Sequence, residues 1–417
     1  MRKLAIALLV VMTYTGISFA NIGKAMLTPF HLIMGFCIGY GLILSRKNST
    51  YTWFTLVVFL VYVLIVNVVQ YPNIRYTSVV YTIVYGLETT ILYNMIRRCP
   101  AGDIVFAFKL IIYSYAVNLF FGFAFDTIGF RNAFVLKYIK VYYHEGGGGG
   151  RPMGFSSEPS YAAFMLSVAF LCYSHMRDHA RDKPTFKVAL AYMMCIVLSK
   201  SAYGFIFVAV NLMDWAVMFY KKGDAILRKL FPYLGVVAIG GLVLFIQNSS
   251  NEVATRLSNV SEVLFDPSLD KKKRMVKLQE VDGSAFARIG PTYLLLTAGE
   301  DSDINYWTGQ GAGAAGVFLA DFMAGIIVDD DTEKIDTGII PAFFFDYGII
   351  GFILLLIFLI NCFSRLGFPY WLMFFLVLPN ANINTQLLWF AILSYTFVSV
   401  WKAKPGAIPD LQTAPIQ

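Results

Sequence analysis

Two polar segments between apolar runs carry the residue types that could perform chemistry. The first contains His144, Glu145, five glycines and then Arg151-Pro-Met-Gly-Phe-Ser-Ser-Glu158-Pro-Ser-Tyr161. A guanidinium presents planar donors that match phosphate oxygens, so Arg151 is a candidate for binding an anionic group. The alternatives are a solvated or lipid-contacting Arg151, a Glu158 that merely complements the dipole of the following helix, and glycines that form a flexible linker or a hinge.

The second segment places an arginine directly before an apolar stretch. It begins Asp282-Gly-Ser-Ala-Phe-Ala-Arg288, and residues 289–296 are mostly apolar and include Tyr293. We expect this stretch to hold Arg288 near the headgroups of a bilayer. A glycine-rich run follows at Tyr306-Trp-Thr-Gly-Gln-Gly-Ala-Gly313, but no strand precedes it, so a nucleotide-binding loop is excluded.

The remaining charge and cysteine patterns predict no metal, cofactor or nucleic acid. The basic run Lys271 to Arg274 is typical of a solvated face. The acidic run Asp329 to Asp331 could take a divalent cation, although a solvated face is the more common role. None of the five cysteines lies in the two long polar segments, which excludes a disulfide framework there.

The elements that position these residues are apolar helices. Hydrophobic residues make up 58% of the 417 positions and charged residues only 14%, which indicates lipid as the main solvent. A bilayer core of about 30 Å needs roughly 20 apolar residues per helix. The predicted fold class is therefore an all-α polytopic membrane protein with about twelve helices, at 4–20, 25–45, 51–71, 77–96, 104–126, 160–176, 187–199, 202–220, 230–247, 340–362, 368–379 and 386–401.

Basic residues gather at alternate helix junctions and predict the orientation. Under the positive-inside rule both termini are cytoplasmic, and the long loops 127–159 and 248–339 lie outside. Residues 1–404 form one membrane domain and 405–417 a disordered tail. A cleaved signal at residues 1–20 is the alternative for the first helix. The basic junctions taken as cytoplasmic contain Arg2, Lys3, Arg46, Lys47, Arg97, Arg98, Arg177, Arg181, Lys183, Lys187, Lys221, Lys222, Arg228, Lys229, Arg365, Lys402 and Lys404, and the opposite short junctions only Lys24, Arg75 and Lys200.

Few charges fall well inside the predicted helices. Glu88 lies near the middle of its span and should face a partner or a cavity. Lys109 and Asp214 lie towards cytoplasmic ends and Asp346 towards an outer end, so we expect each to reach the interface. A proton-coupled carrier usually needs more buried ionisable residues, so this scarcity argues against transport.

Four short motifs give the chain a resemblance to a known family. The string Arg151-x-x-Gly-Phe-x-x-Glu158-Pro-Ser resembles the signature of the first large periplasmic loop of Wzy-type O-antigen polymerases of the bacterial inner membrane. Arg288, ten residues and then Gly299 is similar to the Arg-x10-Gly pattern of their periplasmic loops. The remaining two motifs are Leu198-Ser-Lys200-Ser201 and Asp346-Tyr-Gly348-Ile-Ile-Gly351, and together with the helices they span most of the chain.

The O-antigen ligases share this architecture and are the nearest competing class. Their signature places a His-Asn pair eleven residues before the glycine equivalent to Gly348. Thr337 and Gly338 occupy those positions here, and the whole loop 248–339 contains no histidine. This departure favours a polymerase. A flippase or transporter for the lipid-linked repeat and a structural membrane scaffold are the further candidate functions.

The resemblance implies a metal-independent glycosyltransferase with a GT-C-like architecture. The growing chain would leave undecaprenyl pyrophosphate and join an incoming lipid-linked repeat at the periplasmic face, with a chain-length-regulating co-polymerase as a further partner. On this interpretation Arg151 and Arg288 bind the pyrophosphate, and Glu158 engages the acceptor hydroxyl or orients Arg151. The candidates for substrate contacts are Tyr161, Lys200, Asp282 and Tyr293.

Overall fold

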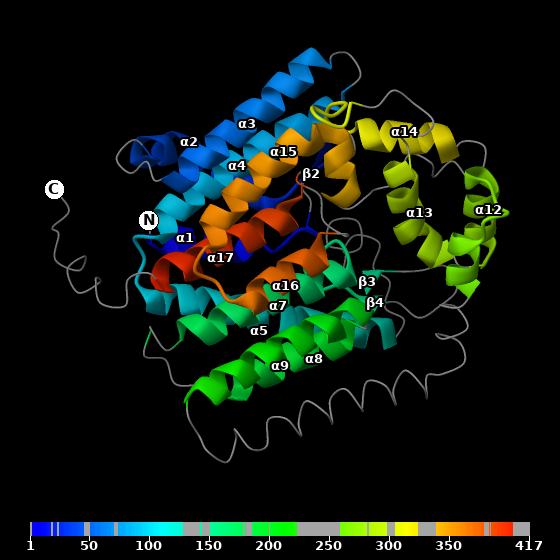
Figure 1. The fold of residues 1–417 in the computed structure, drawn as a ribbon. Helices are drawn as coiled ribbons and strands as arrows, with labels where there is room; N and C mark the ends of the chain where they lie inside the picture. The colour runs from blue at the N-terminus through cyan, green and yellow to red at the C-terminus, as the bar shows by residue number, and fades with distance from the viewer. Residues whose placement is uncertain are drawn as a thin grey trace.

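The computed structural model of the chain is a bundle of helices with a smaller lobe at one end (Figure 1). Two short antiparallel ladders are the only strands in the part of the chain that it describes. That part comprises residues 2–17, 20–22, 25–45, 51–70, 74–127, 142–143, 151–177, 180, 186–199, 201–222, 259–281, 283–297, 305–323, 339–378, 383 and 385–402.

The bundle helices fall where the apolar runs predict them. The run 230–247 lies outside the described residues. The run 4–20 is helical only to Val11 and is followed by turns. The run 25–45 is helical only from Pro29, because residues 25–27 pair with residues 20–22. The bundle consists of α1 (Arg2–Val11), α2 (Pro29–Ser45), α3 (Tyr51–Val69), α4 (Tyr76–Ile96), α5 (Ala101–Thr127), α7 (Pro159–Met176), α8 (Phe186–Ser199), α9 (Ala202–Lys222), α15 (Ile339–Phe363), α16 (Phe368–Val377) and α17 (Gln386–Lys402).

Among the residues that the structure describes, three helical segments are long and apolar enough to cross a membrane: Tyr76–Ile96, Ala101–Phe125 and Ala342–Phe363. Shorter apolar segments accompany them at Phe54–Val69, Phe186–Ser199, Gly204–Met218 and Phe368–Val377. The chain is therefore a helical, membrane-embedded protein, whereas the arrangement of twelve spans stays a prediction.

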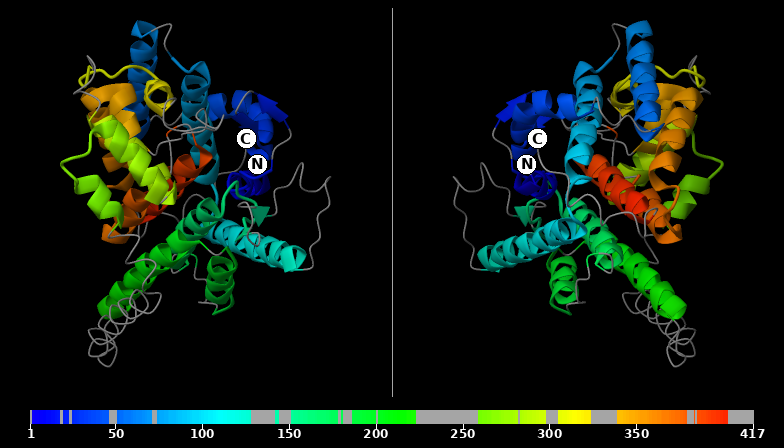
Figure 2. Two further views of the ribbon diagram at one scale, coloured as in Figure 1. Left: turned by 90° about the vertical axis from the view of Figure 1, so that its right-hand side faces the viewer. Right: turned by 90° about the vertical axis from the view of Figure 1, so that its left-hand side faces the viewer.

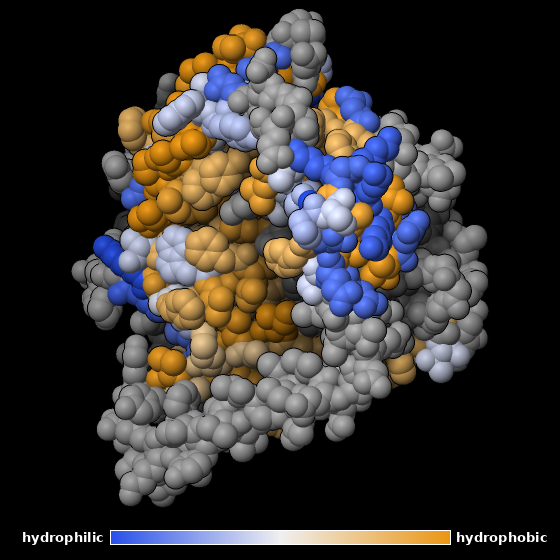
Figure 3. Space-filling model, turned by 45° about the vertical axis from the view of Figure 1, so that its right-hand side comes forward, coloured by the Kyte–Doolittle hydropathy of each residue, from blue (hydrophilic) through white to orange (hydrophobic). Residues whose placement is uncertain are grey.

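The outer surface of the bundle is apolar while polar side chains lie inside. Along α15, Ile350, Ile353, Ile357 and Ile360 recur at helical spacing and are all exposed. A soluble protein rarely exposes a continuous stripe of this kind, but lipid tails cover it at no cost. The space-filling view shows the apolar bundle surface beside the strongly polar lobe (Figure 3).

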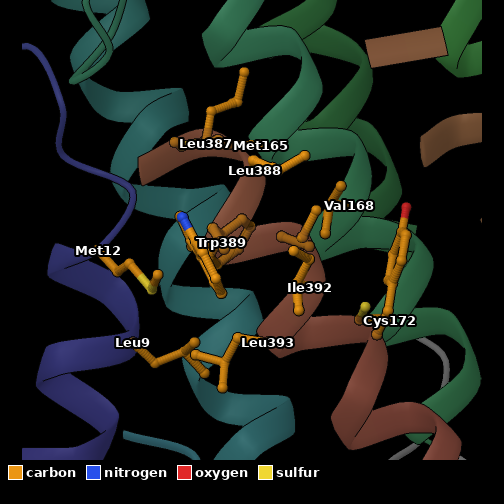
Figure 4. Close-up of a cluster of buried hydrophobic side chains, with 14 of the residues drawn as sticks. Leu9, Met12, Met165, Val168, Cys172, Leu387, Leu388, Trp389, Ile392 and Leu393 are labelled. Carbon is orange, nitrogen blue, oxygen red and sulfur yellow. The ribbon is translucent and has the colours of Figure 1, made fainter. Parts of the chain in front are cut away.

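Helix α17 is the centre of the bundle, since every residue from Gln386 to Ser399 is buried. Trp389 lies between α1 and α7 and donates from its indole nitrogen to the Ile383 carbonyl at 2.7 Å. Around it pack Leu9 and Met12 from the N-terminal segment and Met165 from α7 (Figure 4). The first helix is thus part of the same core, although residues 12–13 after it form a turn.

Two buried acid–histidine pairs account for most of the charge inside the bundle. The Nδ1 atom of His31 lies 3.0 Å from the Glu88 carboxylate, and its Nε2 atom lies 3.2 Å from the Tyr85 hydroxyl. The expectation that Glu88 faces a partner is confirmed. The Asp214 carboxylate is buried 2.8 Å from His175, and the expectation that it reaches the interface stays a prediction.

The lobe is built from α12 (Lys271–Val281), α13 (Gly283–Thr297) and α14 (Ala314–Met323), all within the predicted loop 248–339. Its own core joins Met275 and Leu278 of α12, Phe286 and Leu294 of α13, and Leu319 of α14. The described part of the loop is therefore folded, as the apolar stretch 289–296 predicts. The lobe and the ladder of β3 (Tyr142–Tyr143) and β4 (Arg151–Pro152) lie at one end of the bundle, and α1 begins at the other (Figures 1 and 2).

This sidedness predicts opposite accessibility of two exposed positions. Phe265 lies beside the lobe and Arg98 after α4 at the other end of the bundle. In intact cells a membrane-impermeant maleimide should label a Phe265→Cys variant, and should label Arg98→Cys only after permeabilisation. The wild-type chain is the control, because its five cysteines are all buried. Labelling in the reverse pattern would refute the orientation.

Candidate functional site

The segment after β4 is held rigidly against the bundle. β4 pairs antiparallel with β3, so that Arg151 lies opposite Tyr143. Gly154 has a φ of 64°, and a Cβ there would lie 2.7 Å from the ring of Tyr115 in α5. The backbone N–H of Gly16, in the turn after α1, donates to the Phe155 carbonyl at 2.7 Å. The glycine of the Arg151-x-x-Gly motif is thus required by both its conformation and its packing.

Buried contacts fix the next residues of the motif. The Ser156 side chain is fully buried, and its hydroxyl lies 2.8 Å from the Tyr115 hydroxyl. The Tyr115 hydroxyl also donates to the Thr13 carbonyl. The Phe155 ring packs against Tyr14, with 4.3 Å between the ring centroids. Residues 154–156 of the motif are therefore packed against α5 and the segment after α1.

Glu158 is the N-cap residue of α7, but its side chain makes no capping hydrogen bond. Its backbone is extended, with φ −145° and ψ 153°, and Pro159 begins the helix. The carboxylate is exposed and accepts a hydrogen bond from the Ser160 hydroxyl at 3.2 Å. A capping hydrogen bond is therefore not the role of Glu158, and its oxygens remain available at the surface. Tyr161 is half-buried against the main core.

The structure describes the remaining candidate residues only in part. The backbone of Arg288 lies in α13, at the same end of the bundle as the backbone of Arg151 (Figure 1). Their side chains, and Lys200 and Asp282 entirely, lie outside the described residues. The Tyr293 hydroxyl accepts a hydrogen bond from Arg274, so it takes part in the packing of the lobe itself.

The basic run of α12 is not simply a solvated face. Lys272 and Lys273 are exposed, as predicted. However, Lys271 donates to the Thr297 carbonyl at 2.7 Å and so joins α12 to the end of α13. The guanidinium of Arg274 donates to the Asp266 carbonyl at 2.6 Å. The run therefore helps to hold the lobe together.

A set of hydrogen bonds joins the glycine-rich turn 305–313 to α15 at the point where the regular helix is interrupted. We call this set of contacts the interlock. Gly348 has a φ of 65°, which a regular helix does not allow. The N–H groups of Ile349 and Ile350 donate to the carbonyls of Tyr306 and Trp307, at 2.8 and 3.2 Å. In a regular helix these N–H groups would donate to the carbonyls of Phe345 and Asp346. Here those two carbonyls accept hydrogen bonds from the turn instead. The Phe345 carbonyl accepts from the Gln310 N–H at 2.9 Å, and the Asp346 carbonyl accepts from the Gly311 N–H at 2.8 Å.

The side chain of Asp346 completes the interlock. Its two carboxylate oxygens accept the N–H groups of Gly313 and Ala315, each at 2.8 Å, and so cap the start of α14. The Asp346 carboxylate therefore points into the turn, and the expectation that this residue reaches the interface stays a prediction. The same contacts agree with the exclusion of a nucleotide loop, since these N–H groups already bind a carboxylate of the protein.

Helix α3 and the start of α4 hold the turn from the other side. The Tyr62 hydroxyl donates to the Tyr347 carbonyl at 2.8 Å, and the Asn67 side chain accepts the Ala312 N–H at 2.7 Å. The Gln70 amide donates to the Gly309 carbonyl at 3.2 Å. Nothing in the sequence singles out these three residues, because isolated polar side chains in apolar helices have no recognisable spacing.

No protein-family model matches this chain, and no curated protein matches it. The fold and the site define a class, a helical membrane protein with a folded lobe at one end.

The interlock predicts a strong effect of one added methyl group. A Cβ at Gly348 would lie 2.4 Å from the Trp307 carbonyl oxygen, and its positive φ alone costs an L-residue about 1–2 kcal/mol. We expect Gly348→Ala to lower the unfolding temperature of the purified protein clearly. Gly102→Ala is the matched control, because nothing lies within 4 Å and alanine favours a helix. Equal unfolding temperatures for both variants would contradict this role of Gly348.

Proposed function

We propose that the chain is a membrane glycosyltransferase that polymerises undecaprenyl-pyrophosphate-linked oligosaccharide repeats, as in the biosynthesis of O-antigen or a related surface polysaccharide. The observation that carries the proposal is the state of Glu158. Its carboxylate is exposed, makes no capping hydrogen bond and follows a segment that Gly154 and Ser156 pack against the bundle. An exposed carboxylate close to a packed segment suits an acceptor hydroxyl that must be oriented or deprotonated.

The charge of the leaving group explains the two arginines. A pyrophosphate that separates from the sugar carries negative charge close to the membrane surface. Guanidinium groups placed in advance stabilise such charge without a metal ion. Arg151 on β4 and Arg288 on α13 are the residues that we assign to it, and their backbones lie at the same end of the bundle.

The competing functions have less support. A flippase needs a polar path through the bundle, yet Glu88 and Asp214 are each bound to a histidine of the protein. The recess between α15, α16 and α17 is lined only by apolar side chains, among them Leu355, Trp371 and Leu388. A ligase of the related type would place a histidine where Thr337 stands. A scaffold gives no reason for an exposed carboxylate at the end of a packed motif.

The arginine assignment predicts a specific product. Arg151→Ala and Arg288→Ala should insert normally but yield only single-repeat glycolipid, because the leaving pyrophosphate loses its stabilisation. The measurement is the ladder formed by purified protein from undecaprenyl-pyrophosphate-linked repeats without any nucleotide sugar. Lysine at either position should restore little, since it lacks the fork of donors. Arg98→Ala at the other end of the bundle is the control, and long chains from either variant would refute the assignment.

The Glu158 assignment predicts that activity and stability separate. Glu158→Gln should slow polymerisation about a hundredfold or more, in the range typical of a lost general base. The unfolding temperature should stay unchanged, because no capping hydrogen bond is lost. Ser160→Ala, which removes only the donor to this carboxylate, should keep most of the activity. A Glu158→Gln variant that polymerises at the wild-type rate would exclude Glu158 as the base.

A further inference from the structure

Arg75 is fixed in place by its backbone and its side-chain stem. It is the N-cap residue of α4, and its N–H donates to the Ala312 carbonyl at 2.7 Å. Its Cβ and Cδ atoms lie 2.7 and 2.8 Å from where a Cβ of Gly313 would be. Its Nη1 atom lies 3.5 Å from the corresponding point at Gly316 in α14. The two glycines therefore form a cradle in which the stem of Arg75 lies.

The guanidinium at the end of this stem has no hydrogen-bond or ion-pair partner among the residues that the structure describes. Arg75 is exposed at the end of the bundle that carries the lobe. Its neighbour Asp346 attracts it electrostatically but uses both carboxylate oxygens on the N–H groups of Gly313 and Ala315. Ordering a long side chain costs conformational entropy, so a packed arginine whose donors bind none of the described residues needs a reason.

The distribution of charge along the chain points in the same direction. In the predicted topology, basic residues at short junctions fall almost entirely on the cytoplasmic side, and Arg75 is one of three exceptions. A guanidinium there would meet the phosphate groups at the surface of the bilayer. The guanidinium matches phosphate oxygens in geometry as well as in charge.

We propose that Arg75 is a phosphate-binding residue, and that its ligand is the diphosphate of a lipid-linked substrate held beside the interlock. The identity of the lipid rests on the proposed function, whereas the phosphate chemistry rests on Arg75 alone. The alternative source of the phosphate is the headgroup of an ordinary phospholipid. A purely structural Arg75, which only balances the charge of Asp346, is the role to be excluded.

The test compares Arg75→Gln with Arg98→Gln in the full chain. Glutamine keeps part of the stem on Gly313 but removes the guanidinium, and Arg98 is an exposed arginine at the other end. Binding of undecaprenyl pyrophosphate and of phosphatidylglycerol is measured by native mass spectrometry in detergent. We expect Arg75→Gln to bind the diphosphate about tenfold more weakly and phosphatidylglycerol equally well, as expected for one lost charge-assisted hydrogen bond. Arg98→Gln should bind both as the wild type does.

The remaining outcomes each have a defined meaning. Weaker binding of both lipids supports the phosphate site but assigns it to a headgroup, and unchanged binding of both overturns the proposal. If Arg75→Gln unfolds at a lower temperature than the wild type, the binding measurement is repeated with Arg75→Lys, which keeps the positive charge near Asp346. Weaker diphosphate binding by that variant at wild-type stability still supports the site, and wild-type binding overturns it. A wild type that binds diphosphate through Arg75 but forms no polymer overturns the proposed function alone.

Discussion

Backbone hydrogen bonding in lipid is the constraint on which the rest of this structure depends. Peptide groups inside a bilayer find no water, so each must be bonded within the protein. Helix α15 interrupts its regular bonding at Gly348 and still meets this demand, because the turn 305–313 supplies two acceptors and two donors. The lobe is therefore joined to the bundle through main-chain groups that neither partner can leave unpaired.

The same constraint bears on the buried acidic side chains of the bundle, two of which lie against a histidine. His31 lies between Glu88 and Tyr85, and Asp214 lies against His175. An unpaired charge in this environment would cost several kcal/mol or more, so Glu88 and Asp214 each lie against a histidine. These contacts also cross between helices distant in sequence, since 57 residues separate His31 from Glu88. They fix which helices are neighbours where apolar packing alone specifies little.

The helices could be predicted from apolar runs, but their contacts could not. Residues 104–126 and 340–362 match α5 and α15 within a few positions. The run 4–20 is too long, because hydropathy does not reveal the turn that meets Phe155. Both glycine motifs, 306–313 and 346–351, stand out in the sequence. The two motifs contact each other because α15 is interrupted within the second and the turn bonds to the freed backbone groups. Such a contact depends on backbone geometry, and no residue spacing in the sequence predicts it.

The shared core of the lobe also has a consequence for the order in which the protein is assembled. Ala342 and Phe345 of α15 belong to the same buried cluster as Phe286 of α13 and Leu319 of α14. The lobe helices leave the ribosome first, yet their core is incomplete until the following helix has arrived. Insertion of α15 into the bilayer is thus also the step that completes the core of the lobe. The two events are coupled because Ala342 and Phe345 of α15 belong to that core.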